Sequence, residues 1–390
     1  MIRISDKAQC CGCTACVTAC PKQCIVMRRD REGFDYPMAN PDLCVECGLC
    51  EKICPVLNQN ADCGLDSAPI ATYAARNEGQ LEKSSSGGLF PLLAAAFIQR
   101  GASVCGAVVD ETCGVAHVEV VDMSGIERLK GSKYVQSDLY SILDDVKCLL
   151  EEGREVLFSG TPCQVAGLKA YLRKDYSNLY TVDFACHGVP SPGLWELYRK
   201  NVEKRYGDSL INVDFRDKSS GWRHYNIRYD FRTNPSVSTP AVDDPYMALF
   251  YQDMTLRPSC YNCSFRGGKS GSDLTLSDLW NVEKAAPAMN DDRGVSGVVI
   301  NTAAGERLWE MIKPLLMVEP ISEAALKASN GGFSGSIEIP QRRQEFFKGM
   351  YSATDIHKWM KSFVVKKPLY IRAYRSIRKT LSTLKRRILK

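Results

Sequence analysis

Cysteine recurs at a fixed spacing over the first 55 residues, and this pattern strongly constrains the fold. Two runs have the form C-x2-C-x2-C-x3-C, and each is followed directly by proline: Cys10, Cys13, Cys16 and Cys20 before Pro21, then Cys44, Cys47, Cys50 and Cys54 before Pro55. Short loops of this kind bring three thiolates to one [4Fe–4S] cubane, whereas the fourth thiolate, displaced along the chain, reaches the other cubane. The spacing therefore predicts two crossed ligand sets: Cys10, Cys13, Cys16 and Cys54 for one cluster, and Cys20, Cys44, Cys47 and Cys50 for the other.

A pair of zinc sites is the alternative, because C-x2-C is also typical zinc-ligand spacing. Two pairs of cysteines suffice for zinc, so the third close cysteine and the proline would then have no role. We therefore favour iron–sulfur clusters. The head of the chain is similar to a bacterial-type ferredoxin with two [4Fe–4S] clusters, and such a segment transfers electrons.

The composition is that of an ordinary globular protein, with 390 residues, 45% apolar and 24% charged. No secretory leader is evident, so we expect a cytoplasmic, reducing location in which most of the 18 cysteines are ligands or redox groups rather than disulfides. Positive charge is concentrated after residue 363, where ten Lys and Arg occur without one acidic residue. The remainder is net acidic, which argues against a nucleic-acid partner.

Hydrophobic periodicity and turn signals divide the chain into three parts. We expect a ferredoxin-like domain at 1–60, a larger domain at 68–335, and a helical extension with a basic tail at 336–390. Strands such as 155–158 and 179–185 alternate with helices such as 89–99 and 164–173, whereas 235–245 reads as a loop. The predicted fold class is therefore α+β to mixed α/β, with the larger domain built around one sheet system.

Four later cysteines lie at chemically distinctive places. Cys163 and Cys186 each follow a predicted strand, and Cys260 and Cys263 form a lone C-x2-C in a polar loop. These segments can close around one metal centre, but buried thiols that act as small apolar side chains are the alternative. A lone C-x2-C does not decide between them. Six other cysteines are expected to have core or incidental roles: Cys11, Cys24, Cys63, Cys105, Cys113 and Cys148.

Residues from about 70 to 280 resemble the beta subunit of coenzyme F420-reducing hydrogenases and dehydrogenases. The matching motifs are Ser84-Ser-Ser-Gly-Gly88, Lys130-Gly-Ser-Lys-Tyr134, Gly160-Thr-Pro-Cys-Gln164, Cys186-His-Gly188, Cys260-x2-Cys263 and Ser277-Asp-Leu-Trp280. The resemblance implies FAD and an additional [4Fe–4S] cluster beside it. On this basis Cys163, Cys186, Cys260 and Cys263 are the expected ligands of that third cluster.

Two of these motifs have the chemistry that a flavin dinucleotide needs. The first precedes a helix, so its amides can face an anion: Ser84, Ser85, Ser86, Gly87 and Gly88. The second offers two cations, a hydroxyl and an aromatic face: Lys130, Gly131, Ser132, Lys133 and Tyr134. A helix cap and a solvated loop are the respective alternatives. Neither motif is a G-x-G-x-x-G, so no Rossmann-type site is predicted.

Iron–sulfur clusters carry single electrons, whereas most organic substrates take two, and a flavin bridges these regimes. We therefore predict an iron–sulfur flavoprotein oxidoreductase that passes electrons between a ferredoxin-type partner and a small-molecule substrate. No residue demands F420 itself, and cluster spacing does not fix the direction. An electron-relay subunit of a larger redox complex, without its own substrate, is the alternative; a zinc-stabilised binding protein is a third.

Catalytic side chains are less evident. His187 follows Cys186 and is a candidate proton donor, although a turn histidine would look the same. His224 can contact an anionic substrate or lie at a solvated strand end, and we favour the latter. No hydrolytic motif is present. The basic tail predicts an amphipathic helix that lies peripherally on the inner membrane face, docks onto a partner, or remains a solvated end.

Overall fold

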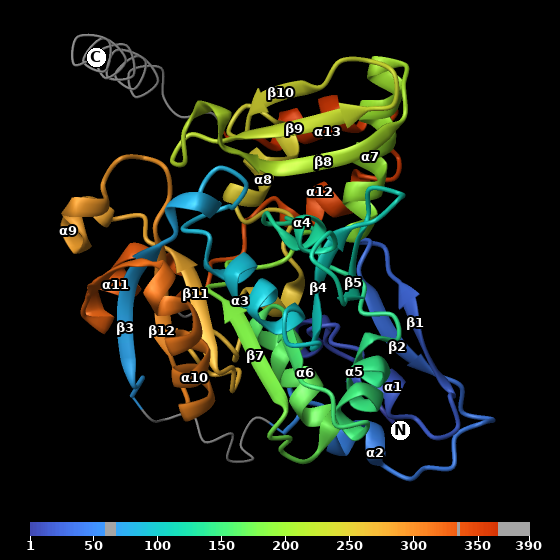
Figure 1. The fold of residues 1–390 in the computed structure, drawn as a ribbon. Helices are drawn as coiled ribbons and strands as arrows, with labels where there is room; N and C mark the ends of the chain where they lie inside the picture. The colour runs from blue at the N-terminus through green and yellow to red at the C-terminus, as the bar shows by residue number, and fades with distance from the viewer. Residues whose placement is uncertain (59–67, 334–335, 366–390) are drawn as a thin grey trace.

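An eight-stranded mixed sheet forms the centre of the body (Figure 1). The computed structural model describes residues 1–58, 68–333 and 336–365. The sheet order is β13-β3-β12-β11-β7-β6-β4-β5, and its central strands β11, β7, β6 and β4 run parallel. The strands are β3 (Ala71–Arg76), β4 (Ser103–Val109), β5 (Val115–Val120), β6 (Val156–Ser159), β7 (Leu179–Phe184), β11 (Leu274–Asp278), β12 (Ser296–Ile300) and β13 (Met317–Pro320).

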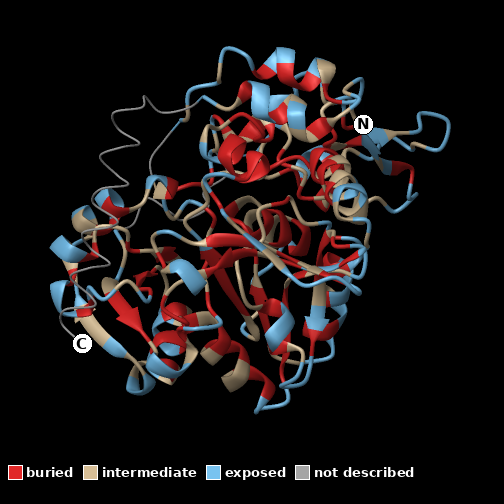
Figure 2. Ribbon diagram, turned by 90° about the horizontal axis from the view of Figure 1, so that it is seen from above, coloured by how far each residue is buried: buried red, intermediate tan, exposed pale blue. Residues whose placement is uncertain are grey.

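Helices cover both faces of this sheet, which explains why its strands are apolar runs rather than alternating ones. Along β6, Leu157 packs with α3 (Leu89–Ile98) and α10 (Ala303–Ile312), whereas its neighbours Val156 and Phe158 pack on the opposite face with α5 (Ile142–Glu151) and α6 (Pro162–Leu172). This is the period of two that a strand imposes. Figure 2 shows buried residues concentrated in the sheet and on the inner sides of these helices. The shorter helices are α4 (Ile126–Leu129), α9 (Val282–Ala285) and α11 (Glu323–Ser329).

A second, three-stranded antiparallel sheet forms its own layer. Its order is β10-β9-β8, from β8 (Leu210–Asp217), β9 (Asn226–Phe231) and β10 (Val237–Pro240). It packs with α7 (Pro192–Tyr206), α8 (Pro245–Tyr251), α12 (Arg343–Gly349) and α13 (Ile356–Phe363) in a core rich in aromatic side chains. The last two helices come from the predicted C-terminal extension, so this extension completes a core of the body.

The N-terminal head contains a hairpin and two short helices. These are β1 (Ile25–Arg29), β2 (Asp35–Ala39), α1 (Ala15–Thr18) and α2 (Leu49–Lys52), and Gly33 takes a positive φ of 78° in the predicted hairpin turn. The hairpin side chains Phe34 and Tyr36 are buried in the same core as α12 and α13. The head therefore shares its apolar contacts with the body.

Two buried arginines fasten the head to the body. Arg257, only 1% exposed, donates to the carbonyl oxygens of Cys10 and Asp35 at 2.7 and 2.9 Å. Arg343, on α12, holds the Glu32 carboxylate with two hydrogen bonds of 2.9 and 2.7 Å. Paired hydrogen bonds of this kind fix orientation as well as distance, so the head is held in one position on the body.

The mixed α/β class is confirmed, with two corrections to the element assignments. The body has two sheets instead of one sheet system, and the predicted loop 235–245 contains β10, which pairs with β9. Residues 59–67, around the boundary between the first two predicted domains, and the basic tail at 366–390 lie outside the described residues. No helix within the described ranges has the length and apolar character that a membrane span requires.

Candidate cofactor pocket and cysteine sites

Two small cavities in the head are lined by the two predicted ligand sets. One, of about 20 Å³, is lined by Cys10, Cys13, Cys16 and Cys54, together with Cys11. The other, also about 20 Å³, is lined by Cys20, Cys44, Cys47 and Cys50, together with Cys24. The chain thus brings each fourth cysteine across to the opposite run, and the sulfur donors suit iron–sulfur clusters.

The two cavities differ in their exposure to solvent. Cys13, Cys16 and Cys54 are buried, and burial raises the pKa of the Cys16 thiol to about 12. At the other cavity Cys47 is exposed and Cys44 is half-buried. The first cavity therefore faces the body and the second faces outward.

Cys11 and Cys24, for which we expected incidental roles, contact cysteines of the predicted ligand sets. The Cys24 and Cys20 thiols lie 3.4 Å apart, and the buried Cys11 thiol is within hydrogen-bonding reach of Cys13 and Cys163. Cys105 and Cys113 are fully buried core thiols and Cys148 is exposed, as expected for core or incidental positions. Cys63 lies outside the described residues.

The four later cysteines are also brought together. Burial and the nearby Cys163 together raise the pKa of Cys260 to about 12 and that of Cys263 to about 11. Cys186 interacts electrostatically with the other three. A Cβ added at Gly188, two residues after Cys186, would lie 3.1 Å from Cys260 Cβ, so this glycine permits a close approach. Among the described residues, however, no group of three or more Cys, His, Asp or Glu side chains lies close enough to hold a single metal ion.

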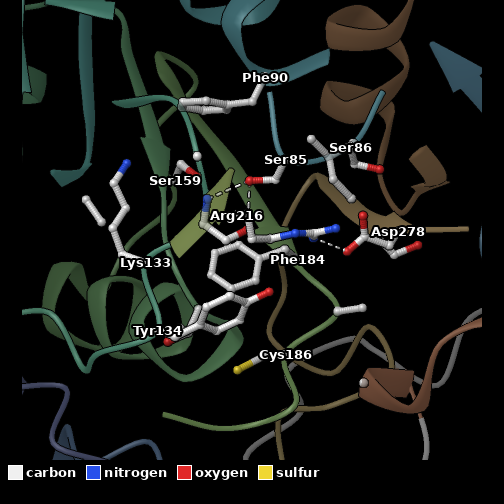
Figure 3. Close-up of a pocket in the computed structure, with 18 of the residues that line it drawn as sticks. Ser85, Ser86, Phe90, Lys133, Tyr134, Ser159, Phe184, Cys186, Arg216 and Asp278 are labelled. Carbon is white, nitrogen blue, oxygen red and sulfur yellow. Dashed lines mark hydrogen bonds and ion pairs between the residues drawn. The ribbon is translucent and has the colours of Figure 1, made fainter. Parts of the chain in front are cut away.

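A cavity of about 490 Å³ lies beside this third set, at the carboxyl ends of β6, β7 and β11. Crevices at the carboxyl ends of parallel strands are the usual ligand sites of α/β sheets. Its wall contains Gly160 and Thr161 after β6, Cys186 and His187 after β7, and Trp280 after β11. Figure 3 shows Cys186 at the edge of this cavity. One wall therefore adjoins the cysteine set.

Both predicted flavin motifs line this cavity, although their contacting residues Ser85 and Ser132 are 47 positions apart. From the first motif it is lined by all residues except Gly87, and from the second by all five. The Ser132 amide and hydroxyl both donate to Ser85 Oγ, at 2.6 and 2.9 Å (Figure 3). Gly88 and Gly131 have positive φ values of 80° and 79°, which glycine adopts without strain.

The two lysines of the second motif are not available to an anion in the way that we expected. Lys130 pairs with Glu127 at 2.6 Å. Lys133 donates to the carbonyl oxygens of Arg128, Leu129 and Lys130 at 3.1, 3.0 and 2.8 Å, and burial lowers its pKa to about 7. Lys133 therefore caps the end of α4, whereas Lys130 forms an ion pair with a carboxylate of that helix.

Several buried polar atoms of the cavity wall have no hydrogen-bond partner within the described part of the chain. They are Ser84 Oγ, His117 Nδ1, and Arg216 Nε and Nη2. Unpaired buried polar groups are rare in proteins and call for an explanation such as a missing ligand. Sequence reasoning missed His117 and Arg216, which lie inside strands. The Ser84 and Arg216 donors, the open space at Gly131 and the helix start at Gly88 fit a polar, anionic cofactor.

His187 is held by a neighbouring carboxylate. Its Nε2 lies 2.5 Å from Asp253 Oδ1, and its ring packs edge-on against Phe250. Asp253 has a positive φ of 60°, an uncommon conformation for aspartate. The His187 ring thus has a defined orientation in the cavity wall, whereas His224 is exposed in the turn before β9.

Comparison with known proteins agrees with this arrangement. Residues 153–324 match the family described as the C terminus of the coenzyme F420 hydrogenase/dehydrogenase beta subunit, and residues 9–58 match the 4Fe–4S dicluster domain. The head is 45% identical over 42 residues to the ferredoxin 7Fe of Hydrogenibacillus schlegelii, covering 11% of this chain and 47% of that protein. It is 38% identical over 53 residues to ferredoxin-1 of Caulobacter vibrioides, covering 14% and 42%.

The chain therefore spans less than half the length of these curated relatives. A structure of the F420-reducing [NiFe] hydrogenase complex from Methanosarcina barkeri aligns with a TM-score of 0.46 and 17% identity, covering 75% of this chain and 91% of that one. The head of the chain thus matches the 4Fe–4S dicluster domain, and residues 153–324 of the body match the C terminus of the coenzyme F420 hydrogenase/dehydrogenase beta subunit.

Proposed function

We propose that the protein is an iron–sulfur flavoprotein oxidoreductase that passes electrons between a ferredoxin-type partner and a small-molecule substrate. The observation that carries this proposal is the cavity of about 490 Å³, whose wall is formed both by the two predicted flavin motifs and by Cys186. A redox cofactor in that cavity would lie directly beside the third cysteine set. The division into domains at 1–60, 68–335 and 336–390 is part of this proposal.

The positions of the three cysteine sets support a linear electron-transfer chain. The outward-facing set contains the exposed Cys47, and the body-facing set is mostly buried. Cys11 lies against both Cys13 of the body-facing set and Cys163 of the third set. We therefore propose [4Fe–4S] clusters at all three sets, with Cys163, Cys186, Cys260 and Cys263 holding the third. The route runs from the outward-facing set to the cavity, in either direction.

FAD is the cofactor that we propose for the cavity. When bound, it would exchange single electrons with clusters and electron pairs with organic substrates. The Ser84–Gly88 turn and Ser132 would hold the dinucleotide, since the turn presents amides at the start of α3. His187, oriented by Asp253, is the side chain best placed to hold or deliver a proton at the cavity wall.

Anaerobic purification with iron, sulfide and flavin quantified per chain tests this proposal. We expect about twelve iron atoms and one FAD for three [4Fe–4S] clusters and a flavin. About eight iron atoms without flavin would indicate that only the ferredoxin head carries cofactors and that the body has no redox role. A colourless, zinc-containing protein would contradict the proposal altogether.

A relay subunit of a larger redox complex is the second candidate, favoured by the outward-facing cysteine set, where a partner protein can reach Cys47. The two functions separate in a reduction assay with dithionite-reduced ferredoxin. If the purified chain turns over a small acceptor such as a deazaflavin by itself, it is the enzyme. If turnover requires a copurifying assembly, it is the relay.

A further inference from the structure

Arg216 brings a buried positive charge into the cavity. It lies near the end of β8, is 3% exposed, and belongs to the cavity wall. Figure 3 shows its guanidinium group crossing the cavity in the region of Ser85 and Tyr134, pointing toward Asp278. A buried arginine is costly unless its charge and its five N–H donors are matched.

The surroundings of Arg216 satisfy only part of this group. Nη1 donates to Asp278 Oδ2 at 2.6 Å. The rings of Tyr225 and Trp280 lie 4.6 and 5.1 Å from the guanidinium carbon, within cation–π range. Nε and Nη2 are buried without a partner among the described residues. Nη1 of the guanidinium group is therefore paired, whereas the edge formed by Nε and Nη2 is not.

The unpaired edge has a specific chemical preference. Nε–H and one Nη2–H point the same way, and this pair matches the two oxygens of a carboxylate or phosphate. Lys130 and Lys133, the other lysine or arginine side chains of the wall, are engaged by Glu127 and by carbonyl oxygens. An anion in the cavity would therefore find its strongest donor pair at Arg216.

We propose that the Nε–Nη2 edge of Arg216 binds an oxyanion of the cavity's ligand, supplied by the pyrophosphate of FAD or by a carboxylate or phosphate on the substrate. This inference rests on the proposed function in assigning the cavity to a flavin and its substrate. It makes Arg216 the anion anchor in place of the two lysines, and it restricts the cavity to ligands that carry such a group.

The test compares full-length wild type with Arg216→Gln, which removes the charge, and Arg216→Lys, which keeps the charge but not the fork. Arg343→Gln is the matched control, because Arg343 is also buried and stacked on an aromatic ring but has partners outside the cavity. Flavin-depleted protein is titrated with FAD and with riboflavin, which has no phosphate. Flavin-loaded and flavin-depleted proteins are then titrated calorimetrically with inorganic phosphate and with succinate.

If the oxyanion is the FAD pyrophosphate, Arg216→Gln weakens FAD binding by about 150-fold or more, as expected for two lost charge-assisted hydrogen bonds. Arg216→Lys has a smaller effect, and riboflavin binding is unchanged. If the oxyanion belongs to the substrate, FAD binding is unchanged and the flavin-loaded variant loses phosphate or succinate binding by a similar factor. Arg343→Gln matches the wild type in both cases.

Equal weakening of FAD and riboflavin binding would overturn the inference, because that result indicates a structural role. Unchanged binding of all four probes would overturn it as well. If the wild type binds no flavin, the flavin assignment fails and phosphate and succinate decide the inference alone. Phosphate or succinate must then bind to the wild type and bind more weakly to Arg216→Gln. If neither binds to the wild type, or if binding is unchanged in Arg216→Gln, the proposed role of Arg216 is refuted.

Discussion

Replacing Arg257 should lower the reduction potential of one head cluster and leave the other unchanged. Arg257 Nη2 lies 3.6 Å from Cys10 Sγ, a proposed ligand of the body-facing cluster. A nearby cation and hydrogen bonds to the sulfurs favour the reduced, more negative cluster and so raise its potential. No cysteine of the outward-facing set is among the contacts of Arg257 in the described residues.

The size of the effect follows from Coulomb's law. Two unit charges 3.6 Å apart interact by about 4.6 kcal/mol at an effective dielectric constant of about 20. An added electron is spread over a whole cluster instead of one sulfur, so we take about half of this energy, ~2 kcal/mol. Since 59 mV corresponds to about 1.4 kcal/mol for one electron, Arg257→Gln should lower the potential by about 85 mV.

The measurement is a potentiometric titration of both head clusters followed by electron paramagnetic resonance. Arg257→Lys keeps the charge and should shift the potential by less than half as much. Arg343→Gln removes the other buried arginine between head and body, which contacts Glu32 and no cysteine among the described residues, so it controls for loosened docking. The reasoning is refuted if neither potential moves in Arg257→Gln, or if Arg343→Gln produces the same shift.

Three further outcomes are expected. Gly167→Ala places a Cβ 2.5 Å from Cys13 Cβ, so it should lower the free energy of unfolding by about 1–3 kcal/mol in urea titration and reduce iron content; unchanged values would contradict this close contact. Burial raises the pKa of Asp183 to about 6. Because the fold favours the neutral form of Asp183, the free energy of unfolding should fall as the pH rises from about 4 to about 6 and then level off. Asp183→Asn should remove up to about 3 kcal/mol of that fall. Denaturation at pH 4.5 and pH 7.5 measures the difference. Gly87→Ala drives a Cβ into the carbonyl oxygen of Ala75, so it should lower flavin content but leave iron content unchanged; an unaffected flavin content would show that this turn is not part of the site.

The features that sequence reasoning predicted best are those that depend on local spacing. The cysteine runs predicted which thiols share a cavity, because the loops between them are too short to allow many arrangements. The two motifs that residue chemistry singled out line one cavity, and their role in holding a flavin stays a prediction. The parallel strands β6 and β7 were evident from their apolar runs.

The features that were missed depend on contacts between distant segments. Arg216 follows a strand pattern that gives no sign of its partner Asp278, which is 62 positions away. In the sequence, Lys133 looks like a free cation in a polar loop. Only the fold shows that its ammonium group donates hydrogen bonds to carbonyl oxygens at the end of α4. The short strand β10 has a polar, proline-containing sequence and is recognisable only by its pairing with β9. Packing, not propensity, determined each of these.

The pairing of Glu32 with Arg343 has a consequence for folding during synthesis on the ribosome. The two residues are 311 positions apart, at opposite ends of the described chain. At ribosomal speeds of about 5–20 residues per second, α12 emerges roughly 15 to 60 s after the head. During this interval Phe34 and Tyr36 lack the apolar partners that α12 and α13 provide. The final contacts between the head and the body therefore form only after α12 and α13 have been synthesised.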